Sequence, residues 1–389
     1  MANPQGAHSG TWKIGIVGCG NIFERYVSGI ARFPRLEVVG CADLDPARSR
    51  AASEATGVPE FTDPGALLNS DQVEVVVNIT PPAAHATVTK AALAAGKHVY
   101  QEKALAASLA EAAEVLDAAR SSGLLVGCAP DTFLGSAGQT ARAAIDSGAI
   151  GEPIGVACFV THTLAETWHP DPTLFFQPGA GPLLDMGPYS MTMMVNCLGP
   201  VVEVSGAARI GVTPRRVVTP GRLVDSVSVH VPTHTSAVLR FASGVVGTVM
   251  MSFDIWCQDL PYIEIYGSTG ILSFADPNSF DGEVRIRSNA GPDWEVVDPA
   301  LPDLGRRGTD DQMLRGVGVA DLVSAIEGGP HRATGNLAYH VLEALTSVET
   351  SSTAHAVVDL ESTCERPAPV SRSDWQAFFA EPGVPATSN

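Results

Sequence analysis

Two glycines and a carboxylate near the N-terminus have types and spacing that suit binding of a dinucleotide. An apolar run from Ile14 to Val17 leads directly into Gly18-x-Gly20, and Asp43 stands at the end of the next apolar run. Gly18 permits a tight turn, Gly20 lets the backbone approach a pyrophosphate, and the helix that follows would point its N-terminal N–H groups at the phosphates. Asp43 can accept hydrogen bonds from ribose hydroxyls and would repel a 2′-phosphate, which favours NAD over NADP.

The other residues of this motif add detail to the prediction. Asn21 and Ile22 open the expected helix and are predicted to bind the cofactor together with the two glycines. Phe23 stands where the usual motif has a third glycine, and we expect it to alter helix packing more than cofactor choice. Leu44 follows Asp43, where an arginine would accommodate the extra phosphate of NADP. A glycine-rich turn alone is weak evidence, so the prediction depends on strand, helix and carboxylate occurring together.

A second polar segment, from Asn78 to His85, leaves an apolar run and enters a helix-like stretch. In an open parallel sheet the ligand lies beyond the carboxyl ends of the strands. Thr80 and Pro81 are therefore predicted to lie along the nucleotide, and His85 near its diphosphate or ribose. The alternative is purely structural, because two adjacent prolines fix a turn and start a helix.

A third segment ends an apolar run in the acid–base pair Glu102-Lys103. A lysine often forms only a surface salt bridge, but at the carboxyl end of a strand facing a nucleotide it can act in catalysis. The pair resembles the Glu-Lys-Pro signature of the Gfo/Idh/MocA oxidoreductases, with Ala104 in the place of the proline. The resemblance implies that Glu102 and Lys103 bind the cofactor and that Lys103 is catalytic.

A glycine-rich stretch from Gly179 to Ser190 resembles the same family's lead into Asp-x-Gly-x-His. Asp185 and Gly187 match, and Tyr189 takes the place of the histidine, as it does in branches similar to glucose-fructose oxidoreductase. The resemblance implies that Asp185 and Tyr189 are catalytic. Asp185 could instead cap a following helix, because aspartate is a favoured N-cap residue.

The resemblance, which covers roughly residues 12 to 355, implies an NAD-dependent oxidoreductase that transfers a hydride between nicotinamide and a carbinol or carbonyl carbon. An alcohol that loses hydride must also lose its hydroxyl proton. Lys103 is the first candidate for that acid–base role, assisted by Tyr189, while Asp185 orients the substrate. Two alternatives stay open: a redox-neutral glycosidase that uses transient oxidation at C3, and a non-catalytic NAD-binding regulator.

The segment from Thr161 to Pro182 indicates the class of substrate. It contains no lysine or arginine, so a strongly anionic substrate would lack obvious partners there. It does contain aromatic and polar side chains that suit the apolar face and hydroxyl edge of a neutral sugar, glycoside or cyclitol. The alternative is that these rings pack the junction between domains. The predicted substrate-binding residues are Lys103, Trp168, His169, Asp185 and Tyr189.

The elements that must position these residues follow two patterns. Up to about residue 130, short apolar runs alternate with helical stretches, which predicts parallel βαβ units in an α/β, doubly wound Rossmann sheet. Stretches of period two then predict an α+β domain with a large, mostly antiparallel sheet. The expected division is a flexible tail at 1–11, an NAD-binding domain at 12–130, a substrate-binding and oligomerisation domain at 131–370 and a C-terminal tail at 371–389.

Composition argues against several other classes of protein. With 389 residues, 45% hydrophobic and 17% charged, the chain is globular and long enough for two domains. A net charge of −18 argues against nucleic acid and anionic membranes as partners. No run is apolar enough for a membrane span or a signal peptide. Seven scattered cysteines without a CxxC pair predict buried thiols in a cytoplasmic protein, with no metal site. The expected partners are a small-molecule substrate and, by the resemblance, a second copy in a homodimer or homotetramer.

Overall fold

The computed structural model describes residues 10–161, 165–255, 259–289, 291–304 and 315–382 of the chain. The chain divides into two compact units. Unit 1 comprises Met1–Gly135, Asp303–Ala338 and Pro367–Asn389, and unit 2 comprises Ser136–Pro302 and Tyr339–Arg366. The domains expected from sequence were continuous, whereas unit 1 takes up two later segments of the chain. Most of the predicted N-terminal tail lies outside the described residues.

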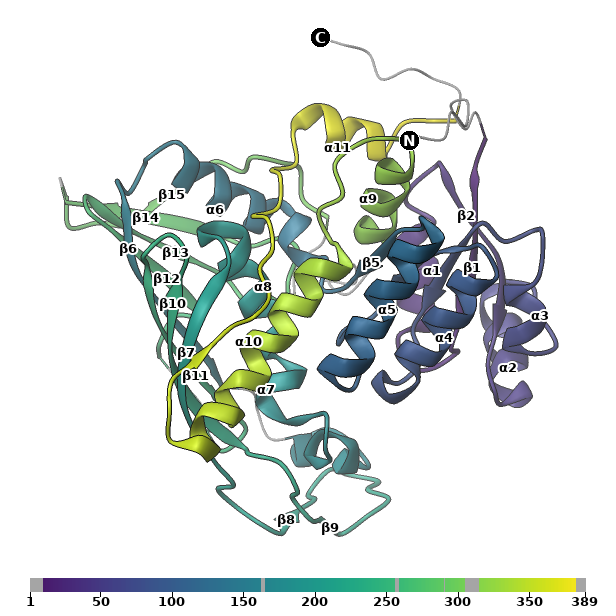
Figure 1. Cartoon of the computed structure of the whole chain (residues 1–389), viewed down its shortest axis with the longest axis horizontal. Coiled ribbons are helices and arrows are strands. Elements are labelled where there is room, and N and C mark those ends of the chain that lie inside the picture. Colours follow the sequence, from purple (N-terminus) through teal and green to yellow (C-terminus); the bar gives the residue numbers. More distant parts are fainter. Residues whose placement is uncertain (1–9, 162–164, 256–258, 290, 305–314, 383–389) are drawn as a thin grey trace. The chain divides into compact units, whose positions relative to one another are not determined.

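Unit 1 is built on a five-stranded parallel sheet, which confirms the predicted doubly wound class (Figure 1). The strand order is β2-β1-β3-β4-β5. β3 is buried along its whole length, as expected for a parallel strand with helices on both faces. The order reverses between β1 and β3, the place at which open α/β sheets bind ligands. The strands are β1 (Trp12–Val17), β2 (Leu36–Ala42), β3 (Val75–Asn78), β4 (His98–Gln101) and β5 (Val126–Cys128).

The helices of unit 1 begin and end at residues suited to those positions. The Asp45 side chain accepts a hydrogen bond from the backbone N–H of Ala47 at the start of α2, and Gly57 ends this helix in the left-handed conformation. Ser108 and Gly123 do the same for α5. The helices are α1 (Phe23–Ile30), α2 (Pro46–Thr56), α3 (Pro64–Leu68), α4 (Pro82–Ala94), α5 (Leu109–Ser122), η1 (Thr132–Leu134), α9 (Val317–Ile326) and α11 (Arg372–Phe378).

The segment expected to be a C-terminal tail begins with a helix, α11. A capping box between Ser371 and Asp374 starts it, and Trp375 is buried. Arg332, which is 1% exposed, donates hydrogen bonds to Asp321 of α9 at 2.9 Å and to Asp374 of α11 at 2.6 Å. The buried guanidinium of Arg332 thus fastens α11 to α9 through one carboxylate of each helix.

Unit 2 contains a nine-stranded sheet in the order β15-β14-β13-β12-β6-β11-β10-β7-β16. β6 and β11 pair in parallel and the other neighbours pair antiparallel, which confirms the predicted mostly antiparallel sheet. A separate two-stranded ribbon joins β8 to β9. The strands are β6 (Pro153–Thr161), β7 (Val201–Arg209), β8 (Arg215–Arg216), β9 (Ser226–Val227), β10 (His234–Phe241), β11 (Val246–Ser252), β12 (Ile263–Gly267), β13 (Gly270–Phe274), β14 (Val284–Ser288), β15 (Glu295–Val296) and β16 (Val358–Asp359).

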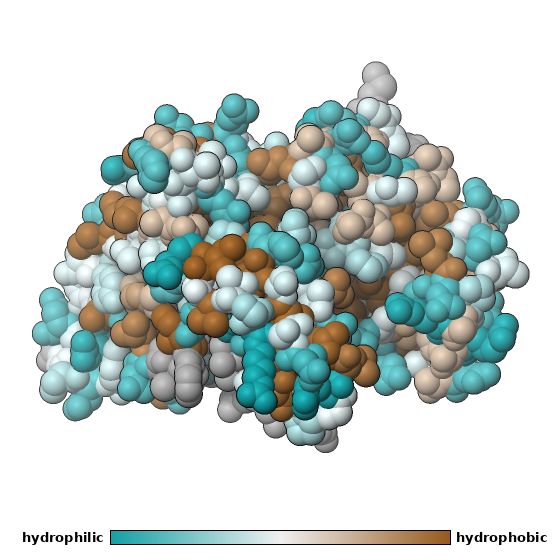
Figure 2. Space-filling model, turned by 90° about the horizontal axis from the view of Figure 1, so that it is seen from below, coloured by the Kyte–Doolittle hydropathy of each residue, from teal (hydrophilic) through white to brown (hydrophobic). Residues whose placement is uncertain are grey.

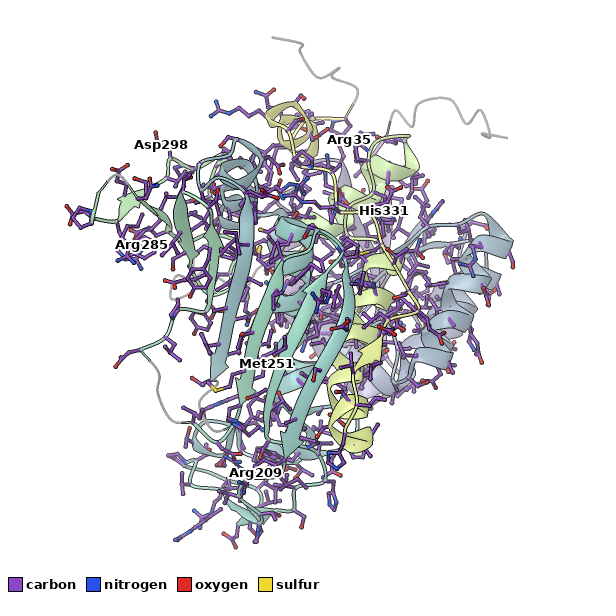
Figure 3. All side chains as sticks on the ribbon, turned by 60° about the vertical axis from the view of Figure 1, so that its left-hand side comes forward. Arg35, Arg209, Met251, Arg285, Asp298 and His331 are labelled. Atoms are coloured by element: carbon purple, nitrogen blue, oxygen red, sulfur yellow. The ribbon has the colours of Figure 1, made fainter. Side chains whose placement is uncertain are left out.

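Helices cover one face of this sheet. α8 is buried along its whole length, and a Cβ on Gly187 would lie 3.2 Å from the sulfur of Met251 on β11 (Figure 3). Val348 of α10 approaches Gly206 of β7 in the same way. The remaining elements of this part of the chain are α6 (Ser136–Asp146), η2 (Ala165–Thr167), η3 (Pro172–Phe176), α7 (Gly181–Asp185), α8 (Gly187–Leu198) and α10 (Gly335–Ala354).

Six cysteines lie in the described ranges, all of them free thiols, and four of the six are buried. Cys257 lies outside those ranges. Among the residues that the structure describes, no group of three or more His, Cys, Asp or Glu side chains could hold a metal ion. Within the same ranges, no helix has both the length and the apolar character needed to cross a membrane.

Candidate functional site

The turn after β1 has the shape that a pyrophosphate requires. Gly18 has a φ of +103°, and a Cβ on it would lie 2.9 Å from the backbone of Ile79 and Thr80, so only glycine fits there. The turns after β1 and β3 are therefore in contact, at the point where the strand order reverses. A Cβ on Gly20 would have no atom within 4 Å, so the backbone at Gly20 faces open space. This open backbone fits the predicted dinucleotide.

The N-terminus of α1 adds N–H groups that suit an anion. Its N-cap residue, Ile22, makes no side-chain cap hydrogen bond, and the N–H of Phe23 donates to the carbonyl oxygen of Gly20 at 3.0 Å. The positive end of the helix dipole still suits an anion. Asn21 beside it is exposed. Phe23 is 1% exposed, so the residue that replaces the third glycine is part of the core of unit 1.

Asp43 is held against the same turn. Its Oδ2 accepts a hydrogen bond of 2.8 Å from the backbone N–H of Cys19, and its Oδ1 accepts one of 2.9 Å from Asp45. A carboxylate has about four lone-pair sites, so two such bonds orient Asp43 and leave capacity for ribose hydroxyls. The side chain is half-buried, as a ligand-binding carboxylate at a sheet edge would be.

A buried polar chain runs from the end of β3 to the end of β4. The Thr80 hydroxyl donates to Asn78 Oδ1 at 2.7 Å, and Asn78 Nδ2 donates to Thr89 Oγ1 at 3.1 Å. The Thr89 hydroxyl in turn donates to Gln101 Oε1 at 2.6 Å. Asn78, Thr89 and Gln101 are all fully buried. The sequence analysis did not single out these three residues, although polar side chains at the ends of two apolar strands were a readable signal.

His85 lies inside this polar chain. Its Nε2 is 2.8 Å from the carbonyl oxygen of Thr80 and its Nδ1 is 2.6 Å from that of Ala104. Burial lowers the pKa of His85 below its ordinary value, although these two carbonyls and the Glu102 carboxylate act in the opposite direction. The side chain has no exposed surface. The predicted contact of His85 with the diphosphate or ribose does not agree with this burial, because both ring nitrogens already face backbone carbonyls.

Glu102 faces the interior of unit 1 and is 8% exposed. Its Oε1 accepts a 2.9 Å hydrogen bond from the Tyr26 hydroxyl, and its Oε2 accepts a 3.0 Å hydrogen bond from the backbone N–H of Lys103. Burial and the Glu102 charge raise the pKa of Tyr26, so this hydroxyl stays protonated and donates. Lys103 itself is half-buried at the carboxyl end of β4. A contact between Glu102 and the cofactor remains a prediction.

The second group of predicted residues belongs to unit 2. Asp185 is the last residue of α7 and is half-buried, and Tyr189, which is 9% exposed, lies in the first turn of α8. The N-cap residue of α8 is Met186, with no side-chain cap hydrogen bond. The alternative in which Asp185 caps this helix is therefore wrong, because the chain makes a separate short helix that ends at Asp185.

Three aromatic rings after β6 form a cluster with edge-to-face geometry. Trp168 lies 5.5 Å from His169 and 5.5 Å from Phe175, and His169 lies 5.6 Å from Phe175, measured between ring centroids. Trp168 is 47% exposed, so its ring is open to a ligand. The backbone N–H of Asp171 donates to His169 Nδ1 at 3.1 Å, which makes that nitrogen an acceptor. Apolar and polar residues are interspersed on the face of the molecule shown in Figure 2.

Arg215 of β8 contacts residues on either side of this cluster in the chain, and the sequence analysis missed it. Its guanidinium donates to Glu166 at 2.7 Å and to Asp254 at 2.6 Å, and it lies 5.1 Å from the centroid of the Phe176 ring. The residue is 3% exposed. Two carboxylates thus neutralise the one guanidinium, so it offers no positive charge to a ligand. Nothing in the local sequence of β8 indicates which carboxylates it meets.

Comparison with known proteins agrees with the two folds described above. Residues 12–129 match the family described as an oxidoreductase family with an NAD-binding Rossmann fold, and residues 139–273 match the GFO/IDH/MocA C-terminal domain. The fold is similar to that of a levoglucosan dehydrogenase solved in complex with NADH and L-sorbose, with a TM-score of 0.78, 20% identity and coverage of 91% of this chain and 100% of the other.

Two curated relatives are similar over parts of their length. The dTDP-3,4-didehydro-2,6-dideoxy-alpha-D-glucose 3-reductase of Streptomyces violaceoruber is 33% identical over 199 residues, which is 50% of this chain and 57% of the relative. The inositol 2-dehydrogenase of Salmonella typhimurium is 34% identical over 152 residues, 38% of this chain and 45% of the relative. The matched segments thus span about half of the length of these relatives. Because both domain families match, in order and over the two folds described above, the chain belongs to the Gfo/Idh/MocA family of oxidoreductases and its N-terminal part is an NAD-binding Rossmann domain.

Proposed function

We propose that the protein is an NAD-dependent oxidoreductase that transfers a hydride between nicotinamide and a carbinol or carbonyl carbon of a neutral sugar, glycoside or cyclitol. One observation carries the proposal above the others. Lys103 lies two residues after the end of β4, β4 pairs with β3, and the turn after β3 contacts Gly18 of the nucleotide turn. A lysine at this edge of the sheet has the place required of an acid–base group beside a dinucleotide.

The residues that would hold NAD lie around the reversal of strand order. Gly18, Gly20, Asn21 and Ile22 would bind the pyrophosphate through backbone and helix N-terminus, and Asp43 would bind the ribose. Thr80 and Pro81 would border the nucleotide from the turn after β3. NAD, when bound, accepts or donates the hydride. Everything else in the reaction depends on where the protein holds the substrate and its proton.

The side chains would accept and return the proton of the reacting hydroxyl group. When a carbinol is oxidised, its hydroxyl proton must leave, and the Lys103 amine in its neutral form can accept it at Nζ. When a carbonyl is reduced, the same group returns the proton. Tyr189 would assist through its hydroxyl, and Asp185 would orient the substrate hydroxyls by accepting hydrogen bonds from them.

The preference for a neutral ring-shaped substrate rests on charge and on the relatives. The guanidinium of Arg215 is neutralised by Glu166 and Asp254, so the aromatic cluster offers no cation to an anionic group. Trp168 is an exposed ring of the kind that packs on the apolar face of a sugar. The name of the inositol 2-dehydrogenase supports a neutral cyclic polyol, whereas that of the dTDP-sugar reductase supports a sugar ring but not its neutrality. A cytoplasmic location and a homodimer or homotetramer complete the proposal.

Replacement of Lys103 by methionine tests the assignment. K103M should lower kcat about a hundredfold or more, the scale of general acid–base catalysis, while the Kd for NADH changes little. The matched control is K90M, because the ammonium of Lys90 on α4 pairs with Glu114 at the surface, at 2.5 Å. If K103M turned over like K90M, the assignment of Lys103 would be wrong.

A substrate panel tests the activity. We expect neutral sugars or inositols to reduce NAD, measured as the near-ultraviolet absorbance of NADH. Turnover of nucleotide-activated sugars alone would contradict the neutral substrate. Cleavage of glycosides without net NADH formation would identify the redox-neutral glycosidase, and NADH binding without turnover of any member of the panel would identify the regulator.

A further inference from the structure

One buried imidazole joins the two turns on which the proposed chemistry depends. The turn at Thr80 borders the proposed nucleotide site, and the turn at Ala104 follows the proposed catalytic lysine. His85 of α4 stands between them, with Nε2 at 2.8 Å from the Thr80 carbonyl oxygen and Nδ1 at 2.6 Å from the Ala104 carbonyl oxygen. Each ring nitrogen therefore serves a different turn.

Both turns are also held by other buried side chains, and His85 adds a direct connection between them beside the polar chain through Asn78, Thr89 and Gln101. Gln101 Nε2 donates to the carbonyl oxygen of Leu105 at 2.6 Å, which fixes the chain after Lys103. Asn78 Oδ1 accepts hydrogen bonds from the hydroxyl of Thr80 at 2.7 Å and from its N–H at 3.2 Å, which fixes the other turn. Asn78 Nδ2 further donates to the carbonyl oxygen of His85 at 3.2 Å. The imidazole therefore bridges two turns that are each locally rigid, at Thr80 on one side and Ala104 on the other.

We propose that His85 is a positioning residue that fixes the Lys103 turn relative to the cofactor-side turn at Thr80. The proposal rests on the proposed function for what the two turns do, but the connection itself rests only on geometry. His85 does not contact the reacting groups in this role. It acts through the backbone of Ala104, one residue after Lys103, where a displacement of about 1 Å can cost about a hundredfold in rate.

The two hydrogen bonds can be removed one at a time. A carbonyl oxygen only accepts, so each contact needs a proton on the facing nitrogen, and both hydrogen bonds are made when the ring is an imidazolium. Burial disfavours that form, whereas the two carbonyls favour it. The charged groups nearest the ring are Glu102, which raises its pKa, and Lys103, which lowers it. An asparagine places its amide nitrogen where Nδ1 stands, and a glutamine places its own where Nε2 stands. H85N thus keeps the Ala104 side, and H85Q keeps the Thr80 side.

Hydrogen–deuterium exchange of the cofactor-free protein tests the connection between the two turns and requires no enzymatic turnover. We expect H85Q to accelerate exchange in the segment 101–106 and H85N to accelerate it in the segment 79–82, while H85L accelerates both. K90Q on the same helix serves as the control, because the Lys90–Glu114 pair lies on the surface. Equal exchange patterns in H85Q and H85N would contradict the proposal.

Kinetics then separate positioning from simple loss of structure. H85Q should lower kcat about tenfold or more while the Kd for NADH stays within about threefold of the K90Q value. H85N should raise the Kd for NADH at least about threefold, with a smaller effect on kcat than H85Q has. Loss of the folded state in both variants, or equal losses of kcat and NADH affinity, would overturn the proposal because a merely structural role predicts those results. If the wild-type protein showed no turnover, the proposed function would fail, and the exchange experiment would still decide the role of His85.

Discussion

The hydroxyl of Tyr26 donates a 2.9 Å hydrogen bond to Oε1 of Glu102, a residue 76 positions further along the chain. Tyr26 belongs to α1, whose N-terminus faces the proposed phosphates, and Glu102 immediately precedes Lys103. Because Oε2 of the same carboxylate accepts the backbone N–H of Lys103, one buried side chain connects the helix to the lysine turn. Glu102 thus has a structural task that does not depend on any cofactor contact.

Replacement of Tyr26 by phenylalanine should destabilise unit 1. Y26F removes the hydroxyl that donates to a carboxylate that is 8% exposed, and a hydrogen bond lost by a buried charged group costs about 1–3 kcal/mol in the free energy of unfolding. Urea denaturation followed by circular dichroism measures the change. Y266F is the matched control, because Tyr266 donates to Glu264 on the exposed surface at 3.0 Å, and it should shift stability by less than about 0.5 kcal/mol. Equal shifts in the two variants would contradict the role of the buried pair.

Replacement of Asp43 by asparagine should weaken the discrimination against NADP. The Asp43 carboxylate is fixed by the N–H groups of Cys19 and Asp45, so its charge stands beside the nucleotide turn. D43N keeps an acceptor for one of these N–H groups but loses the negative charge that would repel a 2′-phosphate. We expect the ratio of the Kd values for NADPH and NADH to fall at least about tenfold, which is about 1.4 kcal/mol. Fluorescence titration measures both values, and D71N at an exposed position is the control. An unchanged ratio would show that Asp43 does not select the cofactor.

Replacement of Arg215 by methionine should affect both stability and the substrate site. R215M leaves Glu166 and Asp254 without the cation between them, and removal of one partner from a buried ion pair costs about 3–5 kcal/mol. The aromatic cluster follows Glu166 in the chain, so we also expect KM for the substrate to rise more than the Kd for NADH. Thermal denaturation and steady-state kinetics measure the two effects. R222M removes the exposed Arg222–Asp225 pair and should leave both values near those of the wild type.

Acid should destabilise unit 1 through His98 of β4. Burial, and secondarily the nearby His331 (Figure 3), lower the pKa of His98 to about 4, and its Nδ1 accepts the backbone N–H of Leu125 at 3.0 Å. The unfolded chain, with a pKa of about 6.5, binds the proton more readily than the folded chain. The contribution is therefore fully present above about pH 6.5 and is lost as the pH falls from there towards 4, by at most about 3 kcal/mol.

The asparagine variant separates His98 from other acid-sensitive groups. H98N keeps a side-chain acceptor for the Leu125 N–H but cannot take up a proton, so its free energy of unfolding should fall less between pH 7 and pH 5 than that of the wild type. Urea denaturation at several pH values measures this difference. H355N, at an exposed position, should follow the wild type. A parallel fall in H98N and the wild type would assign the acid sensitivity to other residues.

Much of the fold could be predicted because it depends on local pattern. The alternation of apolar runs and helical stretches up to about residue 130 predicted the parallel sheet, and the period-two stretches after it predicted the mostly antiparallel sheet. The position of Gly18, Thr80 and Lys103 at one sheet edge also followed from the rule that parallel strands align their carboxyl ends. The class of site could thus be inferred without knowledge of any side-chain contact.

The partners of individual side chains could not be predicted in this way. His85 contacts the carbonyl oxygen of Ala104, and Arg215 donates to Glu166, because of how separate elements pack. No periodic pattern in the sequence indicates either contact. The helix α11 is a different case, since Ser371 and Asp374 form a readable capping signal that the Pro-rich and Ser-rich surroundings outweighed.

The divided chain of unit 1 has a consequence for its synthesis. α9 packs on β4 and β5, where Gly318 leaves room for the ring of Tyr100, and α11 is fastened to α9 through Arg332. A ribosome completes β5 long before it reaches these helices, and domains generally fold as units during translation. The nascent sheet therefore exposes the apolar surface that α9 later covers until the ribosome has passed Ile326. A premature stop even shortly before Ser371 would release a nucleotide-binding unit that lacks its last fastening.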